Sequence, residues 1–217
     1  MLHRRAAAWC EDHDLPEETL EYAMAAGDVV AAGCLIDQLV IPTYWQARIS
    51  TVQRWLRWLD DRGGMEGHPI AAIWASLIAA VEGRPMEAER WADAVDRWLY
   101  QDTPRRADPA AEAWATMLQY TLCRDGVEQM RADADEAVHR FAAAGIVAAT
   151  VPMAQGIARV LCGDLDGGDA FLEDGVRIGD RGAPDVVVRA LAQRALVAME
   201  RIDGTRPRPS PARPAPS

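Results

Sequence analysis

The sequence predicts an all-α fold: a right-handed α-solenoid of about five antiparallel helical hairpins plus a terminal capping helix, over residues 1–203. Three observations support this prediction. Apolar residues recur every three to four positions along almost the whole chain, which is the period of an amphipathic helix. Turns rich in glycine and proline interrupt the pattern at regular distances, with Gly83, Gly126 and Gly163 separated by 43 and 37 residues. Alanine is abundant, and β-branched residues do not gather into strand-like runs.

The clearest hairpin lies on either side of Gly83. Because only Gly83-Arg84-Pro85 separates the two helices, and neither can bury its apolar stripe alone, the two helices are expected to pack antiparallel. The first stripe follows one helix face and consists of Ile70, Ile73, Trp74, Leu77, Ile78 and Val81. The second consists of Ala88, Trp91, Ala92, Val95, Trp98 and Leu99.

The same unit recurs along the chain. Asp28, Ser50, Asp108 and Asp164 are the expected N-caps, because their short side chains can accept a backbone N–H of the first helical turn. Gly27 is expected to end a helix. Paired helices are predicted over residues 2–13 and 16–26, 29–46 and 51–61, 108–124 and 127–141, and 148–162 and 167–179, with a last helix from residue 184.

The core-facing side of the later helices is predicted from the same period. In the helix after Gly126 it consists of Val127, Met130, Ala134, Val138 and Phe141. In the last helix it consists of Val188, Leu191, Ala195 and Met199. Most of the eight Trp residues also fall on apolar stripes and are expected in the core, namely Trp9, Trp74, Trp91, Trp98 and Trp114.

Composition narrows the range of functions. All 23 basic residues are Arg and Asn is also absent, a bias typical of a bacterial genome rich in G and C. Without Lys, the chain lacks the lysine of P-loop ATPases, kinases and Schiff-base enzymes. The net charge of −10 and the absence of a basic stripe argue against direct nucleic-acid binding.

Residues 204–217 contain five Pro and little that could fill a core, so we expect a disordered tail.

No segment predicts export or membrane insertion. The residues after Met1 form an amphipathic helix instead of an apolar signal segment, and no apolar run approaches the roughly 20 residues of a membrane span. The four cysteines are widely spaced, without a CxxC pair, and are expected to be small buried residues in a reducing compartment. We therefore expect a cytoplasmic protein.

Catalytic and metal-binding patterns are lacking. The four histidines do not have the spacing of metal ligands. The Asp-rich run after Gly163 resembles a calcium loop, but Gly175 stands where that loop requires a bidentate Glu. Ser50 and Ser76, outside the tail, lack a surrounding nucleophile motif. The sequence thus predicts a protein that binds a partner, not an enzyme, with no cofactor and no metal.

Several stretches together resemble a known family. Residues 2–9 (LHRRAAAW) and 15–28 (LPEETLEYAMAAGD) resemble the start of the sensor region in MalT-type, LuxR-family ATP-dependent transcriptional regulators. Residues 51–59 (TVQRWLRWL) resemble the next hairpin of that region, and residues 163–173 resemble a tetratricopeptide-type turn. The resemblance covers nearly all of residues 2–200.

The resemblance implies a role in regulation. In that family the helical repeats sense a small inducer or an inhibitory protein and relay its presence to an N-terminal ATPase and a C-terminal helix-turn-helix. This chain has neither of those parts. It therefore looks like a sensor piece, whose partner is an inducer or a regulatory protein. A free-standing protein–protein adaptor is the alternative, and self-association is also possible. A helical enzyme or cofactor holder is disfavoured by the missing ligand spacings.

One aromatic cluster is a candidate recognition surface. Aromatic groups on the inner surface of a superhelix commonly hold a ligand or peptide. Packing between helices is the alternative interpretation. The candidate residues are Tyr44, Trp45, Arg48, Arg54, Trp55 and Trp58.

Overall fold

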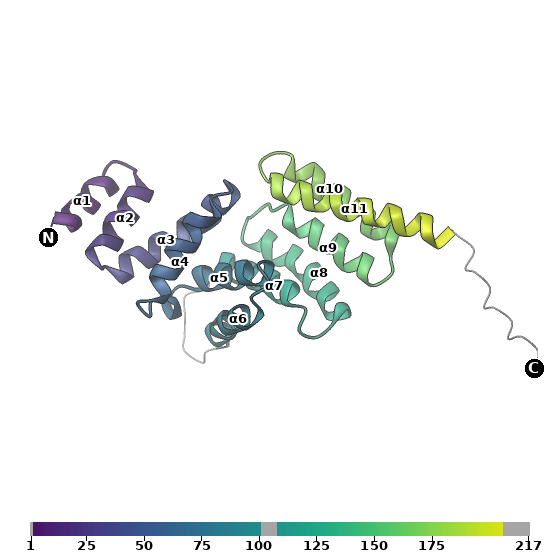
Figure 1. The fold of residues 1–217 in the computed structure, drawn as a ribbon, viewed down its shortest axis with the longest axis horizontal. Helices are drawn as coiled ribbons and strands as arrows, with labels where there is room; N and C mark the ends of the chain where they lie inside the picture. The colour runs from purple at the N-terminus through teal and green to yellow at the C-terminus, as the bar shows by residue number, and fades with distance from the viewer. Residues whose placement is uncertain (1, 101–107, 206–217) are drawn as a thin grey trace, which may run out of the picture. The chain divides into compact units, whose positions relative to one another are not determined.

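The computed structural model describes residues 2–100 and 108–205, with side chains up to residue 202. Within those residues the chain forms eleven α-helices and one 3₁₀ turn, and no strand. The predicted all-α class is therefore confirmed. Figure 1 shows the helices in chain order, and the connections that consist entirely of described residues are short.

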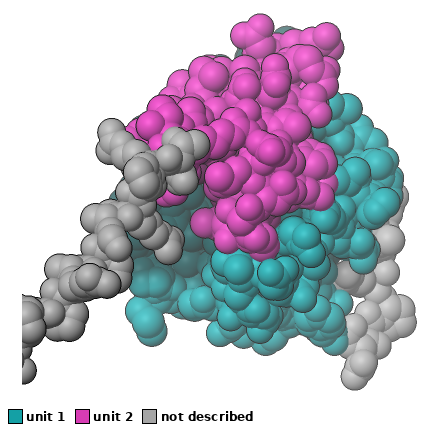
Figure 2. Space-filling model, turned by 90° about the vertical axis from the view of Figure 1, so that its right-hand side faces the viewer, with its two compact units in different colours: residues 1–148 teal, residues 149–217 magenta. Residues whose placement is uncertain are grey.

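The helices fall into two compact units, which Figure 2 distinguishes by colour. The sequence suggested one repeat domain over residues 1–203, whereas the contacts divide the chain into unit 1, residues 1–148, and unit 2, residues 149–217. Unit 1 contains α1 (Leu2–Glu11), α2 (Pro16–Ala26), α3 (Val29–Trp45), α4 (Ile49–Asp60), the 3₁₀ turn η1 (Met65–Gly67), α5 (Pro69–Val81), α6 (Pro85–Leu99), α7 (Pro109–Leu122) and α8 (Val127–Ala143). Unit 2 contains α9 (Thr150–Leu161), α10 (Leu165–Gly179) and α11 (Pro184–Thr205).

The last helix extends beyond its expected end. Helix α11 continues to Thr205, two residues past the predicted domain boundary at residue 203. The remainder of the predicted tail, residues 206–217, lies outside the described residues.

Three of the four predicted N-caps are confirmed. The carboxylates of Asp28, Asp108 and Asp164 accept the backbone N–H three residues ahead, at 3.2, 3.0 and 2.9 Å respectively. The prediction for Ser50 is wrong. Helix α4 begins at Ile49, two residues before the predicted start, so Ser50 lies within its first turn, and Arg48 occupies the cap position without a side-chain hydrogen bond.

A row of aromatic rings connects four helices of unit 1. Tyr44 on α3 contacts Trp74 on α5, Trp74 contacts Trp114 on α7, and Trp114 contacts Phe141 on α8. The successive ring centroids are 4.7, 5.0 and 5.0 Å apart, the range in which tilted aromatic pairs attract. Trp74, Trp114 and Phe141 are buried. Among the described residues, the indole N–H groups of Trp74 and Trp114 have no hydrogen-bond acceptor.

A buried polar contact fixes α3 against the start of α5. The Asp37 carboxylate accepts the backbone N–H of Ala71 at 2.8 Å and lies 2.9 Å from the Nδ1 atom of His68. The His68 ring occupies the space that a β-carbon on Gly33 would need. A glycine at that position therefore allows the two helices to approach.

Unit 2 is packed through glycines. A β-carbon on Gly156 of α9 would lie 2.8 Å from the carbonyl oxygen of Gly168 on α10, closer than real β-carbon contacts. A β-carbon on Gly168 would lie 2.9 Å from the carbonyl oxygen of Gly156. Leu172, one turn further along α10, is completely buried beside this contact. Helices α9 and α10 therefore meet backbone to backbone.

The predicted inner face of α11 is wrong. Val188, Leu191, Ala195 and Met199 are all exposed. The buried side chains are instead Val186, Ala190 and Val197. Apolar residues lie on both sides of this helix, so the period alone could not choose between them. On the side of α11 that faces α10, Arg194 forms an ion pair with Asp169 at 2.7 Å and Arg201 forms one with Asp166 at 2.7 Å. These pairs favour the observed rotation of the helix.

Other predicted core positions also differ. Trp9 is 56 % exposed and stacks on His13, while Val127 and Val138 are exposed at the edges of α8. Of the cysteines, only Cys10 is buried, and Cys34 is exposed. Cys123 and Cys162 lie at helix ends, where neighbouring residues cover them only in part.

Candidate ligand-binding cleft

Half of the predicted recognition residues bind helix α2. Arg48 forms a bidentate ion pair with Glu17, with N–O distances of 2.6 and 2.7 Å. Arg54 forms a second bidentate pair with Glu21, and the Trp55 indole N–H donates to the same carboxylate at 3.1 Å. Trp55 is only 1 % exposed. The guanidinium hydrogen bonds are the main cause of the lowered pKa of Glu17 and of Glu21.

The other half belongs to different surroundings. Tyr44 starts the aromatic row, Trp45 is half-buried at the end of α3, and the half-buried Trp58 lies beneath the guanidinium of Arg62, 4.2 Å from the ring centroid. Four of the six residues, Tyr44, Arg48, Arg54 and Trp55, therefore contact another helix. None of the six lines the cleft between α4 and the hairpin of α5 and α6. Their role in recognition stays a prediction.

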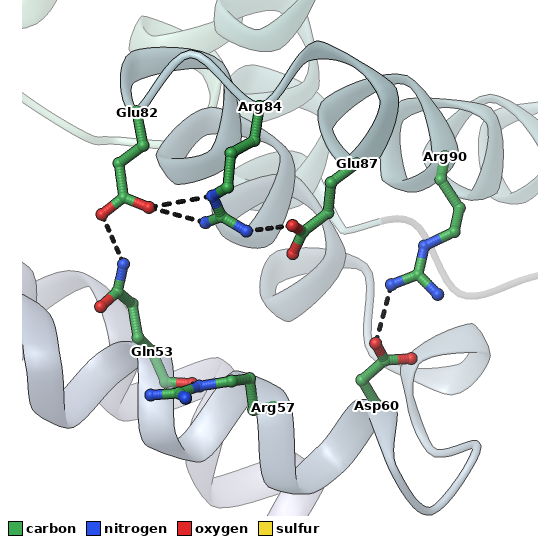
Figure 3. A network of polar contacts seen from close by, with 7 residues as sticks. All are labelled: Gln53, Arg57, Asp60, Glu82, Arg84, Glu87 and Arg90. Atoms are coloured by element: carbon green, nitrogen blue, oxygen red, sulfur yellow. Dashed lines mark hydrogen bonds and ion pairs between the residues drawn. The ribbon is translucent and has the colours of Figure 1, made fainter.

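A cleft of about 310 Å³ lies nearby, between α4 and the hairpin of α5 and α6. This volume is at the lower end of the range of small-molecule sites. Figure 3 shows the polar residues on its two sides, with the α4 side chains facing those of the hairpin. The lining residues are Gln53, Leu56, Arg57, Asp60, Met65, Ala75, Ile78, Glu82, Arg84, Glu87 and Trp91.

The floor of the cleft is apolar, because each adjoining helix presents one apolar side chain or more toward it. Met65 comes from the 3₁₀ turn between α4 and α5, and its side chain is buried. The remaining floor residues are also buried and are Leu56, Ala75, Ile78 and Trp91. This floor suits the apolar part of a ligand.

The acids on the rim are all engaged by neighbours. Glu82 accepts from the Gln53 amide at 2.5 Å and from Arg84 at 2.7 and 3.1 Å (Figure 3). Arg84 also pairs with Glu87, and Arg90 pairs with Asp60 at 2.7 Å. The hydrogen bonds that Arg84 donates to Glu87 and then to Glu82 raise the pKa of Arg84. The contacts Gln53–Glu82 and Asp60–Arg90 connect the two sides of the cleft.

Arg57 is the lining arginine that forms no ion pair with an acid among the described residues. Its Nε atom donates to the backbone oxygen of Gln53 at 3.2 Å, within α4. In the part of the chain that the structure describes, no carboxylate pairs with its terminal nitrogens. Figure 3 shows its side chain lying alongside Gln53 on the α4 side. A guanidinium in this state can bind a carboxylate through two parallel hydrogen bonds.

The lining combines charged side chains with an apolar floor. It contains no Ser, Cys or His that could act as a nucleophile or proton shuttle. Over residues 2–100 and 108–202, no group of three or more His, Cys, Asp or Glu side chains could hold a metal ion. The arrangement can hold an amphipathic molecule with one anionic group.

A second hollow lacks a comparable free cation. It measures about 400 Å³ and lies beside α6, α7 and α8. Its arginine, Arg124, already binds Glu89, Asp93 and Asp96 of α6. The hydrogen bond to Glu89, and then that to Asp96, raises the pKa of Arg124. We therefore regard the first cleft as the candidate site.

The sequence contained a signal for this cleft. Gln53, Arg57 and Asp60 are spaced i, i+4, i+7, which places them on one side of α4. Gln53 and Arg57 belong to the motif over residues 51–59 that carries the family resemblance, and Asp60 follows it directly. Which of its charges would remain unpaired depends on α6, which no local pattern reveals.

Comparisons with models of protein families, with curated proteins and with solved structures found no significant match. In the described part of the chain, no helix is both long and apolar enough to cross a membrane.

Proposed function

We propose that this chain is a non-catalytic helical-repeat sensor domain that binds a small amphipathic carboxylate in the cleft between α4 and α6. The observation that carries the proposal is the guanidinium of Arg57, which no acid among the described residues pairs with, beside a buried apolar floor. Arg57 would pair with the carboxylate of the ligand. Its apolar part would lie over Leu56, Met65 and Ile78.

The wider part of the proposal is a tetratricopeptide-like solenoid of the MalT type. Its support is the run of consecutive helix pairs with short turns, together with the motifs at residues 2–28, 51–59 and 163–173. In a regulator of that type, such a domain transmits binding by favouring one conformation over another.

The cleft offers a physical route for that step. Gln53–Glu82 and Asp60–Arg90 join α4 to the α5–α6 hairpin. A ligand that neutralises Arg57 and fills the floor would favour one separation of these two parts. Ligand binding would then shift the balance between an open and a closed cleft by its difference in affinity for the two.

The test is a binding series with straight-chain and aryl carboxylates, their methyl esters and the matching amines, followed by calorimetry. We expect the carboxylates to bind and the esters and amines to bind at least tenfold more weakly, since a hydrogen bond to a charged group contributes about 1.5–3 kcal/mol. Matching phosphonates and sulfonates show which anion the site prefers.

Arg57→Gln should weaken carboxylate binding by roughly ten- to hundredfold. Arg131→Gln is the matched control, because it removes the same charge from an exposed position on α8. Equal binding by wild type and Arg57→Gln, with Arg131→Gln unchanged, would show that the cleft does not use this cation. Failure of every carboxylate to bind would end the proposal.

A further inference from the structure

Helix α11 carries a stripe of exposed apolar side chains. The helix has 22 residues, more than any other helix described. Val188, Met199 and Ile202 are 66, 59 and 60 % exposed. The stripe, here called the α11 stripe, consists of Val188, Leu191, Ala195, Met199 and Ile202.

The spacing of the α11 stripe is that of a helix–helix seam. Val188, Ala195 and Ile202 are seven residues apart, and Leu191 and Met199 fall between them. The successive steps are three, four, four and three residues, a mean of 3.5, which keeps the side chains on one side of the helix where a second helix can lie alongside. The opposite side of α11 already packs on α9 and α10 through Val186, Ala190 and Val197, so the stripe is additional to the core of unit 2.

Charges are absent from the stripe and arranged along its borders. Arg194 and Arg201 are held by acids of α10, and Arg189 pairs with Asp185 on its own helix at 2.9 Å. Glu200 is exposed and has no partner in the described part of the chain. An uncharged stripe can meet an identical stripe without repulsion between like charges.

The border charges indicate the direction of such a pair. Arg189 and Glu200 are eleven residues apart, about three turns, so they lie on the same side of α11. A second α11 running antiparallel, related by a two-fold axis between residues 194 and 195, brings Arg189 of each copy level with Glu200 of the other. A parallel pair about a two-fold axis would instead place Arg189 of one copy and Glu200 of the other on opposite sides of the seam, where they cannot meet.

We propose that the α11 stripe is the contact between two copies of this chain, formed by two antiparallel α11 helices around a two-fold axis. The same surface serves both copies, as in isologous dimers. One helix pair gives a small interface, so the dimer is expected to dissociate on dilution in the micromolar range. This inference does not depend on the cleft.

The first test measures the mass of the full chain by sedimentation over a wide concentration range. Wild type should shift from monomer to dimer, and Leu191→Glu with Met199→Glu should weaken association by at least tenfold. Val30→Glu with Met86→Glu, at exposed apolar positions of unit 1, is the matched control and should dimerise like wild type. Circular dichroism confirms that the variants are folded.

The second test concerns direction. Arg189→Glu alone and Glu200→Arg alone should each weaken the dimer, and the chain carrying both changes should recover it. A wild-type chain that stays monomeric at all concentrations would overturn the proposal. So would a dimer that survives Leu191→Glu with Met199→Glu, while a double charge exchange without recovery would overturn the antiparallel arrangement.

Discussion

The two units pack their neighbouring helices together with residues of opposite size. Unit 1 spaces its helices with large rings, in the row from Tyr44 through Trp74 and Trp114 to Phe141. Unit 2 brings α9 and α10 together at Gly156 and Gly168, where no side chain intervenes. The comparison shows that helical period alone does not set the distance between neighbouring helices. The size of the residues at each crossing sets it.

The units can be observed separately. All eight Trp residues lie in unit 1 and none in residues 149–217. Tryptophan fluorescence therefore follows the unfolding of unit 1, whereas far-ultraviolet circular dichroism follows both units. The two signals together therefore distinguish the unfolding of unit 2 from that of unit 1.

The largest effect is expected from Trp114→Ala in unit 1. Because Trp114 is buried between Trp74 and Phe141, its removal should leave a cavity and lower the free energy of unfolding by about 3–5 kcal/mol. Urea unfolding followed by fluorescence measures the loss. Trp9→Ala, at an exposed position, is the control and should change stability little. Equal losses in the two variants would show that the aromatic row does not support unit 1.

The next effect is expected from Gly156→Ala in unit 2. A β-carbon there would crowd the Gly168 carbonyl and Leu172, so the variant should lose about 1–3 kcal/mol. Circular dichroism should detect the loss, and the fluorescence transition should stay in place if the units unfold independently.

Gly67→Ala is the matched control, since a β-carbon at that position meets nothing within 4 Å. At an uncrowded helical glycine, alanine stabilises by about 0.5–1 kcal/mol. A Gly156→Ala variant stabilised by that amount would contradict the close backbone contact.

A smaller effect is expected from Trp74→Phe. The buried indole N–H of Trp74 has no acceptor in the described residues, so phenylalanine removes an unsatisfied donor while it leaves a modest gap. We expect a loss of about 1 kcal/mol. Trp55→Phe removes the same atoms but also deprives Glu21 of a donor, and should lose more. A larger loss for Trp74→Phe than for Trp55→Phe would contradict this account.

The smallest effect concerns the dependence of stability on pH in the acidic range. The pKa of Glu21 in unit 1 and that of Asp169 in unit 2 are lowered, chiefly by hydrogen bonds from Arg54 and Arg194. A lowered folded-state pKa means that the stabilisation is complete above the ordinary value, 4.5 for Glu21, and is lost as the pH falls through the folded-state pKa.

Glu21→Gln should therefore lose about 0.2–1 kcal/mol at neutral pH and show a shallower decline in acid. Asp169→Asn should do the same in unit 2, detected by circular dichroism and not by fluorescence. Stability curves that run parallel to wild type between about pH 7 and pH 3 would contradict these assignments.

Local chemistry explains which features could be predicted from the sequence. Helix starts at Asp28, Asp108 and Asp164 depend on a side chain and a backbone N–H three residues away, so the sequence contains both partners. The start of α4 was misplaced because Ser50 has the side chain of an N-cap but lies two residues after the actual cap position, Arg48.

The orientation of helices and the site required distant partners. The rotation of α11 depends on Asp166 and Asp169 of another helix, so its apolar period was ambiguous. Trp55 was expected near a surface, yet Glu21 of α2 accepts its N–H and covers it. Arg57 differs from the other cations near the cleft, because Arg84 and Arg90 pair with Glu87 and Asp60.

The two polar contacts across the cleft, Gln53–Glu82 and Asp60–Arg90, bear on how fast a molecule could enter it. Side chains at a surface change rotamer within picoseconds to nanoseconds. A dissolved ligand at micromolar concentration meets a protein only about a thousand times per second. The contacts therefore open far more often than a ligand arrives, and they do not limit its rate of association. Differences between ligands would then appear as differences in residence time, set by how firmly each one holds Arg57.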